Sequence, residues 1–65
     1  MLKERLKTAR KKKGLTQVEC AVLADIRFAR YSDYERGLKE PTQEIISRLE
    51  RVLEVETGWL TSIND

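Results

Sequence analysis

The chain has 65 residues, with one cysteine, no histidine and a formal net charge of +2. One cysteine without histidine can form neither a disulfide within the chain nor a four-ligand zinc site. The sequence has no nucleophile with a matching base and no glycine-rich phosphate loop, so we expect neither an enzyme nor a cofactor. No apolar run approaches the ~20 residues of a membrane span and the charged N-terminus does not resemble a signal peptide, so we expect a cytoplasmic protein without a membrane partner.

The charged residues are divided unevenly along the chain. Residues 1–39 hold eleven Lys or Arg against five Asp or Glu, whereas residues 40–65 hold two against six. A basic segment favours a polyanionic partner, because binding to phosphates releases counterions. Solvated helix surfaces also carry charge, so this division alone favours nucleic acid only modestly.

The first predicted helix covers about residues 2–12. Leu2, Leu6 and Ala9 recur at helical spacing between charged residues, which is the pattern of an amphipathic helix. Basic residues 10–13 follow at its C-terminal end, where cations complement the helix dipole, and Gly14 ends the helix. The same basic residues are candidates for contacts with phosphates, and the two roles are compatible.

Residues 16–37 predict two short helices, covering about residues 16–24 and 27–36, joined by a tight turn. Thr16 and Glu19 have the spacing of a capping box, in which each side chain binds a backbone N–H of the other residue. Small inward-facing residues let the second helix approach closely, and Gly37 can adopt the left-handed conformation that ends it. This arrangement is typical of a DNA-binding helix-turn-helix.

The remaining residues predict a helix that closes the core and a short C-terminal element. Pro41 and Thr42 favour the start of a helix over about residues 43–53, which carries a wide apolar stripe. The apolar residues of the last segment, Val55, Trp59, Leu60 and Ile63, favour a final turn or short helix. The sequence therefore predicts an all-α bundle of about five short helices in a single domain, residues 1–65.

Several pieces resemble, in their order and spacing, the phage repressor/Cro (Xre-like) helix-turn-helix family. They are LKTARKKKGLTQ at 6–17, Ala21, Ile26 at the turn, YERG at 34–37, EPT at 40–42, the helix that follows and WL at 59–60. The resemblance covers nearly the whole chain and implies a lambda-repressor-like fold. It also implies a sequence-specific transcriptional regulator of double-stranded DNA, more commonly a repressor. Such a regulator would bind an inverted-repeat operator as a homodimer, with helix 27–36 of each copy in a major groove.

The resemblance also implies roles for individual residues. Arg10 is expected to pair with Glu35, since the family joins an arginine near the end of its first helix to the glutamate of the YERG-like segment. For Gln17, a solvent-facing role is an equal alternative from sequence alone, and the resemblance favours a phosphate contact. The candidates for phosphate contact are Arg10, Lys13, Gln17, Arg30, Arg36 and Lys39. The candidates for base contact are Arg27, Phe28, Ala29, Ser32 and Asp33.

The chemistry of the base-contact candidates is varied. Arg27 suits a guanine or a phosphate, Phe28 and Ala29 suit thymine methyl groups, and Asp33 suits a cytosine amino group. Folding back of Phe28 into the core is an equal alternative to DNA contact. Cys20 is expected to be a small buried core residue, because no histidine is present to activate a thiol.

Three positions depart from the family pattern. Asp25 stands where glycine is usual, at a turn position that needs a positive φ angle. Glu54 stands where glycine often ends the helix over residues 43–53. Arg27 stands where serine or threonine usually caps the recognition helix, and loss of this cap costs ~1 kcal/mol. A residue that weakens the protein there is easier to explain if it touches DNA.

The C-terminal segment has two interpretations. In repressor-type relatives the surface near the last helix forms the dimer contact, so Trp59, Leu60 and Ile63 are candidates for a homodimer interface. Alternatively Trp59 and Leu60 cap the core, and this alternative is favoured more for Trp59. The segment would also serve a second class of function, a protein-interaction module such as an antitoxin-like partner-binding protein. A restriction–modification controller that activates transcription is a further alternative.

Overall fold

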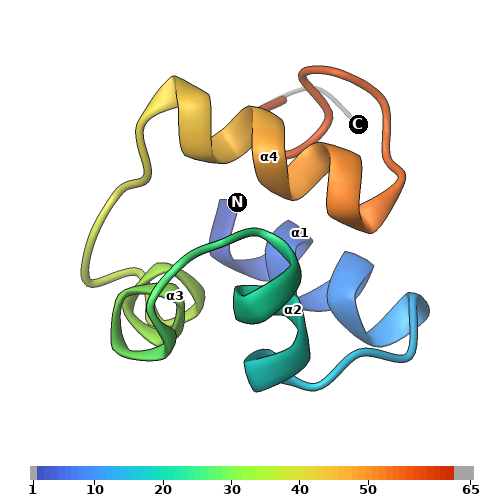
Figure 1. Cartoon of the computed structure of the whole chain (residues 1–65). Helices are drawn as coiled ribbons and strands as arrows, with labels where there is room; N and C mark the ends of the chain where they lie inside the picture. Colours follow the sequence, from blue (N-terminus) through green and yellow to red (C-terminus); the bar gives the residue numbers. More distant parts are fainter. Residues whose placement is uncertain (1, 63–65) are drawn as a thin grey trace.

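The computed structural model describes residues 2–62, and these residues contain four α-helices and no β-strand (Figure 1). The all-α prediction is therefore confirmed, with one helix fewer than expected. Residues 57–61 form turns instead of a fifth helix, because Gly58 has a φ of 89° that a continuous helix cannot contain. The predicted Ile63 lies outside the described residues. The helices are α1 (Leu2–Lys12), α2 (Gln17–Leu23), α3 (Phe28–Arg36) and α4 (Gln43–Leu53).

The helices pack around one small apolar core. α4 spans the top of the view in Figure 1 and the other three helices lie below it. Contacts join α1 to α3, α2 to α3 and α2 to α4. Small residues on α2 allow the close approach of its neighbours, as expected. The core residues are Leu6, Ala9, Cys20, Ala21, Ala24, Tyr31, Tyr34, Ile46, Leu49, Leu53 and Leu60.

All four helices end in the same backbone motif. One or two residues beyond each helix the chain adopts a positive φ angle, and the next N–H returns to a carbonyl five residues earlier. This is the Schellman motif, which satisfies carbonyls that a helix end leaves unpaired. Glycine occupies the left-handed position after α1 and α3. After α2 and α4 the position holds Asp25 (φ 58°) and Glu54 (φ 57°). The hydrogen bonds of the Schellman motif therefore form at these two helix ends without glycine.

Two side chains, Glu50 and Arg5, fasten the C-terminal turns to the helices. Glu50 of α4 is only 4% exposed, and its Oε2 accepts the N–H groups of Gly58 at 2.8 Å and Leu60 at 3.4 Å. Arg5 of α1 donates from Nη1 to the carbonyl of Trp59 at 2.7 Å. Its guanidinium also lies 4.7 Å from the centre of the indole ring, a cation–π contact. These contacts hold the turns at residues 57–61 against α1 and α4.

The burial of this segment corrects part of the dimer prediction. Leu60 is fully buried in the core, so it is not available for a homodimer interface. Trp59 is only partly buried against the core. The core-capping role is thus filled by Leu60 more completely than by Trp59, the reverse of the expectation. No helix within residues 2–62 combines the length and apolar character needed to cross a membrane.

Candidate nucleic-acid interface

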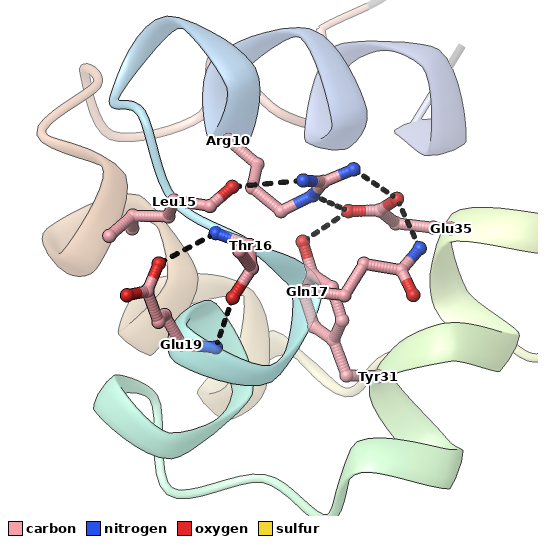
Figure 2. A network of polar contacts seen from close by, with 7 residues as sticks. All are labelled: Arg10, Leu15, Thr16, Gln17, Glu19, Tyr31 and Glu35. Carbon is pink, nitrogen blue, oxygen red and sulfur yellow. Dashed lines mark hydrogen bonds and ion pairs between the residues drawn. The ribbon is translucent and has the colours of Figure 1, made fainter.

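The helix-turn-helix begins with the predicted capping box at the start of α2. Thr16 Oγ1 accepts the N–H of Glu19 at 3.1 Å, and Glu19 Oε1 accepts the N–H of Thr16 at 2.8 Å (Figure 2). Two of the N–H groups at the helix start are thereby satisfied by side chains. The N-terminus of α2, a position that favours anions, is fixed by this local sequence.

The start of α3 has no comparable cap. Arg27 occupies the N-cap position with extended backbone, and its side chain makes no capping hydrogen bond. The first turn of α3 also lacks an acidic residue. α3 therefore lacks a side-chain cap, as expected. Arg27 instead puts a cation at the positive end of the helix dipole. Because Arg27 is the cap, α3 begins one residue later than expected.

The two faces of α3 differ sharply in burial. Tyr31, Tyr34 and Glu35 are buried against the other helices. The base-contact candidates lie on the other side: Arg27, Phe28 and Ala29 are exposed, and Ser32 and Asp33 are partly exposed. Phe28 is 48% exposed, so it does not fold back into the core. Contact of these five residues with bases stays a prediction.

Glu35 is the centre of a buried polar network that joins α1, α2 and α3 (Figure 2). Arg10 of α1 donates from Nε to Oε2 at 2.6 Å and from Nη2 to Oε1 at 3.2 Å. Gln17 of α2 donates from Nε2 to Oε1 at 2.9 Å. Tyr31, one turn earlier on α3, donates its hydroxyl to Oε2 at 2.5 Å. A third guanidinium nitrogen, Arg10 Nη1, donates to the carbonyl of Leu15 at 2.9 Å.

The network keeps Glu35 ionised. Burial by itself would raise the pKa of this carboxyl group, but the hydrogen bonds from Arg10, Tyr31 and Gln17 outweigh burial and lower the pKa below its usual value. The bond to Glu35 in turn raises the pKa of Arg10. Burial raises the pKa of the Tyr31 hydroxyl and of the Cys20 thiol, so both stay protonated at neutral pH. The network is thus a carboxylate with a permanent cation and two neutral donors.

Five of the six phosphate-contact candidates fall into three groups. Arg30, Arg36 and Lys39 are exposed. Lys13 is exposed and lies 3.1 Å from Glu54 Oε1, an ion pair between the ends of α1 and α4. Gln17 is half-buried, with its amide held by Glu35.

Arg10 must be removed from the phosphate-contact candidates. It is 8% exposed, and all three of its guanidinium nitrogens are bonded to Glu35 or Leu15. A guanidinium that is buried and held through each of its three nitrogens is not placed to contact a phosphate. The structure does place it in the expected ion pair with Glu35.

Two members of these polar sites were not foreseen. The sequence places Tyr31 among the inward positions of α3, which predicts a core residue, although its spacing of four from Glu35 on one helix allows the contact. It places Glu50 among the charged residues outside the apolar stripe of α4, which predicts a solvent-facing residue, yet Glu50 is buried under the C-terminal turns. Its partners are backbone N–H groups, which no residue type reveals.

The fold agrees with comparison to known proteins. A family model described as "Helix-turn-helix" matches residues 6–60. The chain therefore belongs to the phage repressor/Cro (Xre-like) helix-turn-helix family, as the resemblance predicted. The match also confirms that this domain is of a DNA-binding type and is not an enzyme.

Two curated proteins illustrate the similarity. The "Putative multi-protein-binding factor 1" of Yarrowia lipolytica is 43% identical over 47 residues, which are 72% of this chain and 31% of that protein. The "HTH-type transcriptional regulator ImmR" of Bacillus subtilis is 37% identical over 59 residues, 91% of this chain and 46% of that protein. The chain thus spans less than half the length of either relative. No solved structure matches it.

Proposed function

We propose that the protein regulates transcription by binding double-stranded DNA through the outward face of α3. The observation that carries this proposal is the exposure of Arg27, Phe28 and Ala29 at the start of a helix whose opposite face is locked by the Glu35 network. A recognition helix enters the major groove with its N-terminal residues toward the bases. The protein would act in the cytoplasm, on DNA.

The polar network gives this face a fixed orientation. Glu35 is bonded from α1 and α2, so α3 cannot rotate about its axis without breaking charge-assisted hydrogen bonds. The exposed cations Arg30, Arg36 and Lys39 accompany the base-contact candidates along α3 and the loop that follows. These cations are suited to phosphates, which position a protein on the duplex without reading sequence.

We further propose a homodimer that binds an inverted repeat with half-sites about 34 Å apart. The partly exposed Trp59 borders a groove of about 500 Å³ lined also by Leu53 and Val55. Lys12 and Glu56 line the same groove. A two-fold contact is self-complementary, so the lysines of one copy can meet the glutamates of the other.

Repression follows if the operator overlaps the promoter, because the bound dimer excludes polymerase. The same domain would serve an activator, as in a restriction–modification controller, if the operator lay upstream. The position of the recovered operator in its genome decides between these alternatives.

A protein-interaction module is the second candidate function. The observation that favours it is an exposed apolar set on α2: Val18 is 54% exposed, Val22 71% and Leu23 60%. Apolar residues gathered on a surface are typical of sites that contact other proteins. The printed name of the Yarrowia relative, a multi-protein-binding factor, is consistent with such a role. The acidic C-terminal segment is less suited to it than expected, because Leu60 is buried.

The first test is a selection of bound duplexes from a random pool at moderate salt. We expect an inverted-repeat motif, and Arg27→Met should lose about 1–3 kcal/mol of discrimination at one position of each half-site. Arg51→Met on α4 is the matched control, since it also removes one exposed arginine but should leave the motif unchanged. Affinity should fall steeply as salt rises.

Binding without any motif, or no binding, would overturn the regulator proposal. If a motif is recovered, sedimentation of the DNA complex distinguishes a bound dimer from a bound monomer. Trp59→Ala should shift the free protein toward monomer. A monomer that recovers only single half-sites would contradict the homodimer while leaving the recognition face intact.

A further inference from the structure

Arg48 of α4 reaches across to the turn between α2 and α3. Its Nη1 atom lies 3.2 Å from the carbonyl oxygen of Asp25 and 3.4 Å from that of Ala24. Its Nη2 atom lies 2.9 Å from Glu44 Oε2, one turn earlier on α4. The guanidinium is therefore held on one side by its own helix and donates on the other side to the turn of the helix-turn-helix.

These two carbonyls need a donor. The Schellman motif at the end of α2 uses the carbonyls of Ala21 and Val22, which accept from Ile26 and Asp25. The motif does not use the carbonyls of Ala24 and Asp25, which accept from Arg48 instead. A cation usually complements a helix C-terminus, but the last turn of α2 has no basic residue. Arg48 supplies that charge from another helix.

The local sequence of this turn specifies its shape weakly. Asp25 holds a left-handed conformation that glycine would adopt without strain, and Arg27 provides no side-chain cap for α3. The capping box of α2 lies at the opposite end of that helix. The joint that sets the angle of the recognition helix is thus the place where a bond from outside has most effect.

We propose that Arg48 is a positioning residue for DNA recognition. It holds the turn by its two carbonyls and so sets the direction in which Arg27 and Phe28 leave the turn, while Glu44 orients the guanidinium. Arg48 itself binds no base. This inference rests on the proposed function, because it concerns the aim of the same recognition helix.

The test compares Arg48→Met with Arg51→Met. Both variants remove one positive charge from α4, so both should lower affinity for random duplex DNA by the same small factor. Operator binding should fall by that same small factor in Arg51→Met. In Arg48→Met it should fall by about tenfold more, because this variant releases charge-assisted hydrogen bonds at the turn. Equal specificity ratios for the two variants would overturn the proposal.

A second variant separates positioning from direct contact with DNA. Asp25→Gly removes the strain of the left-handed residue, so the double variant Arg48→Met/Asp25→Gly should recover part of the operator affinity. A phosphate contact by Arg48 would not be recovered in this way, and failure of the rescue contradicts positioning. Glu44→Gln keeps the arginine but loosens it, and it should give a smaller loss of the same kind.

A measurement without DNA keeps this inference distinct from the proposed function. The N–H groups of Asp25 and Ile26 are bonded to α2 carbonyls, so their hydrogen exchange reports opening of the turn. Exchange at both should be faster in Arg48→Met than in Arg51→Met. Unchanged exchange overturns the role of Arg48 whatever the DNA results, whereas fast exchange in a protein that recovers no motif would contradict only the proposed function.

Discussion

Glu35 and Glu50 are both buried carboxylates, and they are bound by opposite kinds of partner. Glu35 receives side chains from three helices: the guanidinium of Arg10, the amide of Gln17 and the hydroxyl of Tyr31. Glu50 receives backbone N–H groups of the C-terminal turns. The first carboxylate joins the parts of the recognition motif, and the second fastens the turns at residues 57–61.

This difference explains why one site was foreseen and the other was not. A carboxylate paired with a guanidinium can be inferred from two residue types at family positions. A carboxylate that accepts backbone N–H groups has partners that nearly every residue carries. Burial of an acidic residue without a cationic partner therefore indicates a nearby stretch of backbone in need of an acceptor.

Removing the cation from the Glu35 site should have the largest effect. Arg10→Met leaves a buried carboxylate without its counter-charge, and we expect a loss of about 3–5 kcal/mol in the free energy of unfolding, measured in urea. Lys11→Met is the matched control on the exposed side of α1. The double variant Arg10→Met/Glu35→Gln should be more stable than Arg10→Met alone, and a loss below about 1 kcal/mol for Arg10→Met would contradict a charge-dependent network.

The Glu50 site should depend on an acceptor and not on a charge. Glu50→Ala leaves two N–H groups without an acceptor and should cost about 2–3 kcal/mol. Glu50→Gln keeps an accepting oxygen and should cost less than about 1 kcal/mol. The same change at Glu35 removes the counter-charge of Arg10 and should cost clearly more. Urea unfolding measures the loss in free energy of unfolding for Glu35→Gln and Glu50→Gln. Equal losses would contradict the claim that only the Glu35 site depends on charge.

Acid should weaken the Glu35 site. The pKa of Glu35 is lowered in the folded protein, so its contribution to stability is complete above the unfolded value of about 4.3 and is lost as the pH falls through the lowered folded value. Unfolding free energy measured between pH 6 and strongly acidic pH should therefore fall less steeply in Glu35→Gln than in the unaltered protein.

The smallest effect concerns the backbone, where each region has one left-handed residue that is not glycine. Asp25 follows α2 and Glu54 follows α4. Glycine removes a strain of about 1–2 kcal/mol but makes the unfolded chain more flexible, so each replacement should gain ~0.5 kcal/mol, less at Asp25 because aspartate tolerates this conformation. Thermal unfolding gives the measurement. Gly14→Ala should instead destabilise the protein, because Gly14 has a φ of 76° that alanine adopts only with strain, although an added Cβ would meet nothing within 4 Å.

The sequence was sufficient for most of the framework and for one of the two polar sites. Local signals placed the helices to within one or two residues, because Thr16, Gly37 and Thr42 act through their own neighbours in the chain. Of the two possibilities for the last segment, a turn or a short helix, the structure has turns, since apolar spacing does not reveal the positive φ of Gly58. Tertiary contacts were the other gap.

The outcome of those contacts could not be read from residue types. Arg10 was assigned both to Glu35 and to phosphate, and only burial excludes the second role. Leu60 and Trp59 have the same apolar character, yet the packing of the turns buries one fully and leaves the other at the surface. The reach of Arg48 to the turn depends on how α4 crosses α2, which no local pattern encodes.

The placement of the aromatic residues gives each region its own optical reporter. The only tryptophan of the chain, Trp59, lies in the turns that Glu50 fastens, under the guanidinium of Arg5. The two tyrosines, Tyr31 and Tyr34, lie on the buried face of α3, and one of them belongs to the Glu35 network. Indole fluorescence therefore follows the release of the C-terminal turns, while the phenol signals follow the recognition motif. Intrinsic tryptophan and tyrosine signals can therefore follow the Glu50 site and the Glu35 site separately, without an added label.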